Sequence, residues 1–196
     1  MNPSNLFSTK ERIRILEKII YTKLQLSVNK TAKELGLSKG LVSKFFNILT
    51  KEDILIRVGS RGNKFLVLEN LYARIIRILL TANRFDPNLF KRYEFVESVG
   101  LYGRSARGTN SDDSDIEIWI RIRKTKEDEL KKLANELKEK YERIKPLFLT
   151  KVKLKILKEK DPVFYYSLLF GSIGIYNWYI TKVKKNKKIK EKAERR

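Results

Sequence analysis

Two acidic residues, Asp115 and Glu117, have the types and the spacing to hold a hard metal ion. They stand at the start of a strand predicted over 116–122, and residues two apart in a strand point to the same face. Carboxylates side by side repel each other unless a cation neutralises them. The chain has no His and no Cys. Imidazole and thiolate chemistry are therefore excluded, which leaves carboxylates with hard cations, or catalysis by Lys, Tyr or Ser.

A glycine-bearing turn precedes these acids. The residues 96–102 read as a strand that runs directly into Gly103. A turn of this kind after a strand exposes backbone N–H groups that suit a phosphate. A phosphate-binding turn combined with metal-binding acids indicates nucleotide chemistry.

The same stretch resembles the signature of the minimal nucleotidyltransferases in the DNA polymerase β-like superfamily, G-S-x-A-R-G-x(5)-S-D-I-D. Asp115 lies twelve residues after Gly103, at the spacing of that family. The positions that match the signature are Gly103, Ala106, Arg107, Gly108, Ser114, Asp115 and Ile116.

The resemblance implies a small mixed sheet and in-line attack on the α-phosphate of a nucleoside triphosphate, with pyrophosphate leaving. It implies two Mg²⁺ ions, with Asp115 and Glu117 as metal ligands and catalytic residues. From the donors present we expect one Mg²⁺ or Mn²⁺ when the triphosphate is bound, with Lys153 partly replacing the charge of a second ion. The nucleotide-binding residues are expected to be Gly103, Arg104, Ser105, Arg107 and Ser114.

The chain departs from the signature in three places. Arg104 replaces the small Ser, and Glu117 replaces the second Asp. The family supplies a third carboxylate from a later strand, which alternation predicts at 149–157, and there Lys153 takes its place. Three other acids are candidates for that role: Glu97, Asp112 and Asp113.

The N-terminal third predicts three helices and a hairpin. Helical spacing and cap residues define the helices, and a Gly-containing turn separates two β-rich runs. The predicted elements are a helix capped by Thr9 with apolar positions Ile13, Leu16, Ile20 and Leu24, a helix over 30–35 between Asn29 and Gly36, a helix over 39–51 capped by Ser38, and strands at 54–58 and 64–68.

This region resembles the winged helix-turn-helix of many prokaryotic regulators, which read A-x-x-L-G-L-S-x-x-x-V-S; here the run is Ala32 to Ser43. The resemblance implies that the helix over 39–51 enters the major groove and that the hairpin contacts the backbone. An alternative use of such a module is protein interaction or dimerisation. The expected nucleic-acid contacts are Lys39, Ser43, Lys44, Asn47, Arg57, Arg61 and Lys64.

The remaining segments contain no candidate catalytic residues. A helix over 71–83 is predicted with an apolar face of Leu71, Ile75, Ile78 and Leu79, and a polar helix over 124–145. Residues 163–180 contain no charge. Their tyrosines, serines and glycines favour a buried or dimer-forming segment over a membrane span. The basic tail at 181–196 is either a solvated helix end or an arm that contacts phosphates.

Charge indicates the class of partner. The 196 residues include 44 Lys and Arg against 23 Asp and Glu, a net charge of +21. Such a surface attracts polyanions. The excess is concentrated in residues 1–83 (net +9) and in the tail (net +7). No signal peptide is evident, so a cytoplasmic protein is expected. The Lys-, Glu- and Ile-rich composition suits a heat-adapted, archaeal-like source, and AT-rich coding is an alternative explanation for it.

We therefore predict an α+β protein: a winged helix-turn-helix (1–70), a linking helix and linker (71–93), a polymerase β-like nucleotidyltransferase domain (94–160), a C-terminal packing helix (161–180) and a basic tail (181–196). The predicted function is metal-dependent transfer of a nucleotide to a nucleic acid or protein. The alternative is a non-enzymatic DNA-binding regulator with a degenerate, nucleotide-sensing or dimerising domain. The expected partners are duplex DNA, with RNA as the alternative, a nucleoside triphosphate, no membrane, and a second copy through the C-terminal helix.

Overall fold

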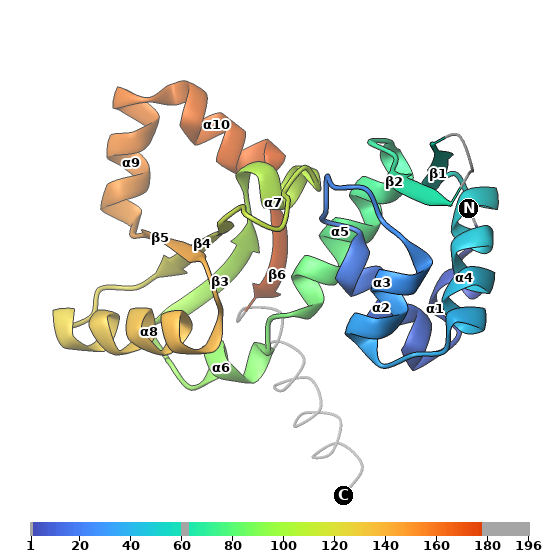
Figure 1. Ribbon diagram of the computed structural model, residues 1–196. Coiled ribbons are helices and arrows are strands. Elements are labelled where there is room, and N and C mark those ends of the chain that lie inside the picture. The colour runs from blue at the N-terminus through green and yellow to red at the C-terminus, as the bar shows by residue number, and fades with distance from the viewer. Residues whose placement is uncertain (1, 60–62, 178–196) are drawn as a thin grey trace, which may run out of the picture. The chain divides into compact units, whose positions relative to one another are not determined.

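The computed structural model describes residues 2–59 and 63–177 (Figure 1). The chain divides into two compact units, one of residues 2–80 with 108–114 and the other of residues 81–107 with 115–177. Arg61, the last residues of the uncharged stretch (178–180) and the basic tail lie outside the described residues.

The first unit is a set of helices followed by a two-stranded hairpin. Strands β1 and β2 pair antiparallel, with Leu55 opposite Val67. Apart from α1, which was not predicted, the helices and strands follow the predicted order. The elements are α1 (Pro3–Phe7), α2 (Lys10–Ile19), α3 (Val28–Leu35), α4 (Lys39–Lys51), β1 (Leu55–Val58), β2 (Lys64–Val67) and α5 (Leu71–Asn83), whose last residues belong to the second unit.

Side-chain caps set most of these helix boundaries. The hydroxyls of Thr9 and Ser38 accept backbone N–H groups at the starts of α2 and α4, as predicted. Gly36 ends α3 in the left-handed region, at φ 64°. Two predictions were wrong. Ser27, not Asn29, caps α3, and Leu24 lies beyond the end of α2, with 73% of its surface exposed.

The buried face of α5 is not the predicted one. Leu71, Ile75 and Leu79 are exposed, whereas the neighbouring stripe packs into the core of the first unit. The helix has two overlapping stripes of apolar residues. The stripe that is buried also contains Arg77, and charged side chains are rarely buried, so the sequence pattern favoured the other stripe. The side chains that this face buries are Ala73, Ile76, Arg77 and Leu80.

Arg77 is buried because its guanidinium has partners on three sides. Its Nε donates to the carbonyl oxygen of Ile20 (2.7 Å), and its Nη1 donates to that of Gly108 (3.2 Å). Nη1 and Nη2 also bind the two carboxylate oxygens of Glu69, at 2.8 and 2.6 Å. These hydrogen bonds hold the pKa of the Glu69 carboxyl below its ordinary value, although partial burial opposes them. Arg77 thus holds the chain at residue 108 against α5.

The second unit is a four-stranded mixed sheet with helices. The strand order is β5-β4-β3-β6, in which β4 pairs parallel with β5 and β3 pairs antiparallel with both β4 and β6. The elements are α6 (Pro87–Lys91), β3 (Val96–Leu101), α7 (Gly103–Arg107), β4 (Ile116–Ile122), α8 (Glu127–Lys140), β5 (Ile144–Leu149), α9 (Lys151–Lys160), α10 (Pro162–Gly171) and β6 (Ile173–Asn177).

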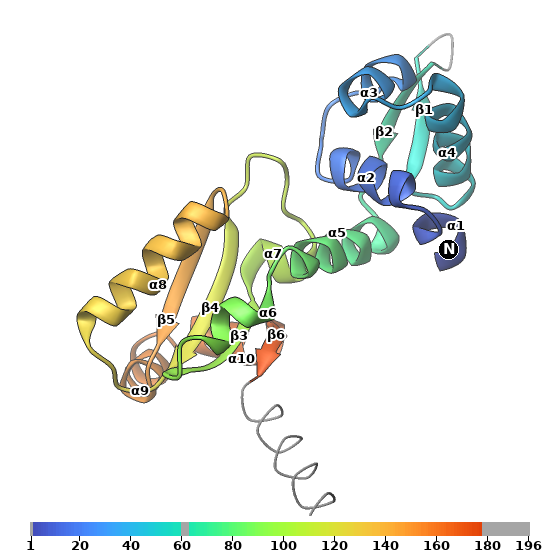
Figure 2. The same cartoon turned by 90° about the horizontal axis from the view of Figure 1, so that it is seen from below.

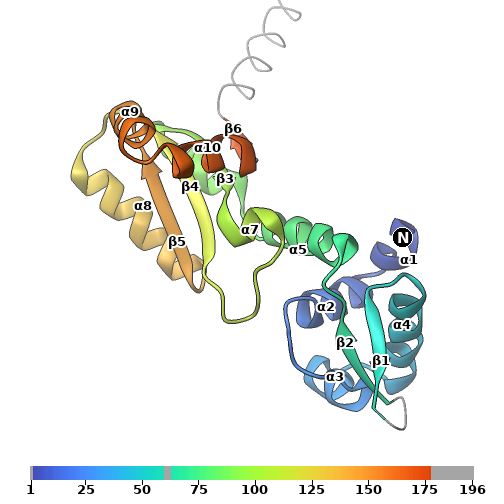
Figure 3. The same ribbon diagram turned by 90° about the horizontal axis from the view of Figure 1, so that it is seen from above.

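Strict alternation along β4 gives the sheet two different faces. The four isoleucines at 116, 118, 120 and 122 are buried in one core with Leu133 and Leu137 of α8. Figures 2 and 3 show α8 on this side of the sheet and α9 with α10 on the other. The residues between the isoleucines therefore point away from α8.

Two predicted boundaries after β4 were wrong. The helix predicted over 124–145 ends at Lys140, and the strand comes earlier, at Ile144–Leu149. The alternating run that predicted a strand at 149–157 forms most of α9, which begins after the cap residue Thr150. Helix α9 buries none of its side chains. Its apolar residues at 152, 154 and 156 alternate with lysines, a spacing that is typical of a strand and led to the wrong prediction.

The uncharged C-terminal stretch is a helix followed by a strand. Asp161 caps α10, as predicted, and β6 pairs with β3. Within residues 2–59 and 63–177, no helix is long and apolar enough to cross a bilayer. Helix α10 buries Leu168 but exposes Val163, Leu169 and Phe170. Dimerisation through this helix remains a prediction.

Replacing Arg77 tests how much the buried guanidinium contributes. Arg77→Met leaves the carbonyl groups of Ile20 and Gly108 without this donor, so we expect the free energy of unfolding to fall by about 1–3 kcal/mol. The control is Arg74→Met, at an exposed position one turn earlier in α5. Surface substitutions change the free energy of unfolding by roughly 0.5 kcal/mol or less. Urea denaturation of the full chain measures both variants, and equal losses would contradict the role given to Arg77.

Candidate nucleotidyltransferase site and nucleic-acid interface

Gly103 lets β3 turn directly into α7. Its φ is +58°, a region that L residues with side chains rarely adopt. A β-carbon at this position would collide with the carboxylate of Glu117. With no side chain in the way, the N–H of Arg104 donates to Glu117 Oε2 at 2.7 Å. The turn and the acidic strand are therefore in direct contact, and Glu117 takes up the N–H of Arg104 that sequence analysis expected to face a phosphate.

Ser105 fastens α7 to β4 rather than facing solvent. Its side chain is fully buried, and its hydroxyl accepts the backbone N–H of Glu117 at 3.0 Å. Arg104 and Arg107, on either side of it in α7, are exposed. Of the side chains predicted to bind the triphosphate from this helix, the two arginines are therefore the accessible ones.

Asp115 and Glu117 lie on the face of β4 that points away from α8. Asp115 is exposed, just before the strand, and Glu117 is half-buried. Among the described residues, only Oε2 of the Glu117 carboxylate takes part in a hydrogen bond, so Oε1 is left for another ligand. Burial, and then the charge of Glu117, raise the pKa of the adjacent Tyr102. The Tyr102 ring packs edge-on against Phe164 of α10, with 6.2 Å between ring centres.

The loop before Asp115 is closed by its own serines. Ser114 Oγ accepts the backbone N–H of Ser111 at 3.0 Å, and the two hydroxyls are also 3.0 Å apart. Ser111 Oγ donates to Asp113 at 2.5 Å. Ser114 is buried, whereas Asp112 and Asp113 are exposed. Ser114 therefore shapes the loop that leads into Asp115.

The strand beside the acids places a different lysine next to Glu117 from the one predicted. Lys153 lies in the first turn of α9, not on a strand. In the register of β4 and β5, Glu117 is opposite Lys145, so both side chains are on the same face. β5 itself, Ile144–Leu149, carries no acid.

Glu97, a candidate for the third acid, lies on β3, beside the end of β4 that is farther from Asp115. It binds Arg121 at 2.9 Å and Arg123 at 3.2 Å. Within the part of the chain that the structure describes, no three Asp or Glu side chains gather into a metal cage. The Asp115 carboxylate and Oε1 of Glu117 fit a hard cation that completes its shell with phosphate oxygens and water.

The first unit brings four of the predicted nucleic-acid contacts to one groove. The cavity, of about 420 Å³, lies between the start of α3, helix α4 and the hairpin. Arg57 donates to Asn47 at 2.5 Å and lies over the Phe65 ring. Sequence analysis missed three polar residues there, Ser27, Asn29 and Asn63. The true cap of α3 would have indicated the first two. The predicted contacts that line the groove are Ser43, Asn47, Arg57 and Lys64.

The predicted lysines of α4 are accessible, but they do not line this groove. Lys39 and Lys44 are both exposed. Lys44 borders a second cavity, of about 460 Å³, between α4 and the start of α2. The face of α4 that could meet a nucleic acid is therefore wider than the groove alone.

Comparison with known proteins supports the predicted nucleotidyltransferase domain. Residues 87–178 match the family model described as "Polymerase beta, Nucleotidyltransferase". This part of the chain is a polymerase β-like nucleotidyltransferase domain, which confirms the resemblance of the motif between Gly103 and Glu117. Among curated proteins, none matches the chain.

Two solved structures are similar to parts of the chain. One is a Sulfolobus solfataricus protein provisionally described as a nucleotidyltransferase, with 18% identity, a TM-score of 0.35, and coverage of 54% of this chain and 85% of its own. The other is the Thermotoga maritima IclR protein, with 17% identity, a TM-score of 0.29, and coverage of 48% of this chain and 40% of its own.

Substitution of Gly103 tests the contact between the turn and the acids. Gly103→Ala adds a β-carbon where the Glu117 carboxylate lies, in a left-handed conformation that costs about 1–2 kcal/mol. We expect loss of stability and displacement of Glu117. Gly171→Ala is the control, because a β-carbon there would meet nothing within 4 Å. Thermal unfolding measures the first effect, and calorimetry of metal–nucleotide binding the second. If Gly103→Ala and Gly171→Ala gave the same unfolding temperature and the same metal–nucleotide binding, the contact between residue 103 and Glu117 would be contradicted.

Proposed function

We propose that the chain transfers a nucleotide from a nucleoside triphosphate to an acceptor and is held on nucleic acid by its N-terminal unit. The observation that carries the transferase half is the contact between the Gly103 turn and Glu117, with Asp115 on the same strand face. It supports the proposal because it brings the exposed arginines of α7, which can bind phosphates, next to the two acids that can bind a metal.

Each accessible residue has a role in this proposal. Asp115 and Oε1 of Glu117 would hold Mg²⁺ or Mn²⁺, which would supply positive charge beside the phosphates. Arg104 and Arg107 bind phosphate oxygens of the triphosphate. An acceptor hydroxyl attacks the α-phosphorus, its proton goes to water, the bond to the β-phosphate bridging oxygen breaks, and pyrophosphate leaves.

A specific observation favours the second candidate, a non-enzymatic regulator that senses nucleotide. Lys145 stands opposite Glu117 on β5, where its charge competes with a second metal ion. Such a site would bind a triphosphate with one metal and release it unchanged. Incubation with radiolabelled triphosphates, Mg²⁺ or Mn²⁺, and cellular nucleic acid and protein separates the two candidates, because only the first gives a labelled acceptor.

The N-terminal unit is proposed to be a winged helix-turn-helix that binds duplex DNA, with RNA as the alternative. Helix α4 presents Lys39 and Lys44 to solvent, and the adjoining groove is lined by polar side chains of α4 and the hairpin. Positive charge in this unit supplies phosphate contacts, and Asn47 with Ser43 supplies hydrogen-bonding groups for base edges.

The proposed metal ligands predict that removing one of them abolishes metal-dependent binding of the triphosphate. Asp115→Asn removes a charged oxygen ligand, so we expect metal-dependent binding of a non-hydrolysable triphosphate to disappear in calorimetry. Asp128→Asn, an exposed acid at the start of α8, should bind like wild type. If Asp115→Asn also binds like wild type, the carboxylate assignment fails.

The proposed role of α4 in DNA binding predicts that neutralising its lysines lowers DNA affinity. Lys39→Gln/Lys44→Gln should weaken binding to a duplex by roughly 1–3 kcal/mol and reduce its salt dependence, because fewer counterions are released. Lys131→Gln/Lys138→Gln on α8 removes the same charge and serves as the control. Fluorescence anisotropy over a range of salt concentrations measures both pairs. Unchanged affinity in the first pair would remove α4 from the interface.

A further inference from the structure

One face of β4 carries acids at one end and arginines at the other. Asp115, Glu117, Trp119, Arg121 and Arg123 alternate with the buried isoleucines, so all five point away from α8. Both ends of the row are accessible. Asp115 is exposed, and the side chains of Arg121 and Arg123 are 45% and 47% exposed. The proposed transferase site uses only the acidic end.

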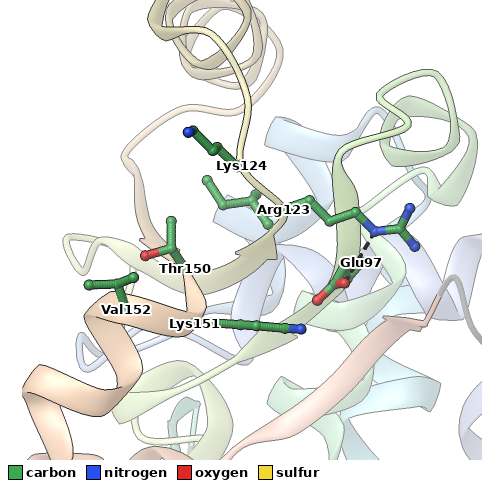
Figure 4. A pocket seen from close by; sticks show the side chains of 7 residues that line it. Glu97, Arg123, Lys124, Thr150, Lys151 and Val152 are labelled. Atoms are coloured by element: carbon green, nitrogen blue, oxygen red, sulfur yellow. Dashed lines mark hydrogen bonds and ion pairs between the residues drawn. The ribbon is translucent and has the colours of Figure 1, made fainter.

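The arginine end opens into a cavity of about 580 Å³ that the proposed transferase site does not use. Figure 4 shows Arg123 reaching to Glu97, and Lys151 extending from the first turn of α9 toward the same space. The lining contains three cations and one carboxylate, so the cavity carries net positive charge. The lining residues are Glu97, Ile122, Arg123, Lys124, Thr150, Lys151 and Val152.

Glu97 holds the arginines in place. It is only 15% exposed, and its two oxygens bind Nε of Arg121 and Nε of Arg123. Each of these ion pairs joins a Glu97 oxygen to a guanidinium Nε, and both arginine side chains stay nearly half exposed. A carboxylate that positions two arginines in this way prepares donors for an anion such as a phosphate.

Trp119 occupies the middle of the row. A β-carbon at Gly100 on the neighbouring strand would collide with its ring, so the absence of that carbon lets the indole lie against β3. The side chain is half-buried. An aromatic ring beside phosphate-binding arginines is an arrangement on which unpaired bases stack.

We infer that the acceptor is a single-stranded polynucleotide that lies along β4, with its end at Asp115 and Glu117 and its backbone phosphates at Arg121, Arg123, Lys124 and Lys151. The inference rests on the proposed transferase function and names its acceptor class. Six residues separate Glu117 from Arg123, which spans about 20 Å of strand, or roughly six stacked nucleotides at about 3.4 Å each. A duplex buries its base faces and would leave Trp119 unused.

Anisotropy of fluorescein-labelled dT12 and U12 tests the inference without metal or triphosphate. The full chain is used in a Lys39→Gln/Lys44→Gln background, which weakens the proposed duplex interface. Adding Lys124→Gln/Lys151→Gln should lower affinity roughly tenfold at 0.1 M salt and reduce the log–log salt slope by about 1.4, for two lost phosphate contacts on a single strand. The arms with dT12 and U12 show whether DNA or RNA is preferred.

A matched control and a second readout keep the test specific. Lys131→Gln/Lys138→Gln, on the far side of the sheet, should leave affinity within about twofold. In a Trp178→Phe variant, Trp119 is the remaining tryptophan, and its fluorescence should be quenched as the strand binds. Equal losses in the two lysine pairs, absence of quenching, or an equally tight duplex that depends on the same lysines would each overturn the inference.

Triphosphate binding separates failure of this inference from failure of the transferase proposal. The Lys124→Gln/Lys151→Gln variant should bind Mg²⁺ with a non-hydrolysable triphosphate as tightly as wild type does. Weaker triphosphate binding in that variant would place these lysines in the nucleotide site and contradict the inference. A wild-type chain that binds the strand through them but binds no triphosphate would instead overturn the transferase function, and with it the acceptor role.

Discussion

The candidate site depends on the absence of a side chain at residue 103. Because Gly103 adopts a positive φ, β3 passes into α7 with no intervening loop, and the N–H of Arg104 reaches the carboxylate of Glu117. Ser105 then binds the backbone of Glu117 from inside the fold. The arginines of α7 and the acids of β4 are thereby held together by backbone geometry, which is stiffer than any pairing of flexible side chains.

Side chains along β4 alternate between the two faces of the sheet, so the same strand supplies both core residues and candidate functional residues. One set of residues, the isoleucines, supplies the core of the second unit against α8. The alternate set is thereby turned to the opposite face, where acids and arginines occupy the two ends. Core packing therefore fixes the register of the functional residues, since a slip of one position would bury the charges and expose the isoleucines.

Local chemistry in the sequence was sufficient to locate much of the fold. Ser38 and Thr9 cap helices that begin where predicted, and Gly36 ends a helix in the left-handed conformation. The bounds of β4 and its shared face for Asp115 and Glu117 also followed from alternation and spacing. These features depend on a few neighbouring residues, so the sequence contains all the information they need.

Tertiary contacts decided what local pattern could not. Arg77 is buried because Glu69 and two carbonyl groups surround its guanidinium, and this reverses the face of α5 that the apolar residues suggested. The run after Leu149 alternates like a strand but forms α9, because the sheet position beside β4 is already filled by residues 144–149. The sequence by itself determined the elements that carry the acids and the turn. Which residues stand beside them, such as Lys145, was decided by strand pairing across distant parts of the chain.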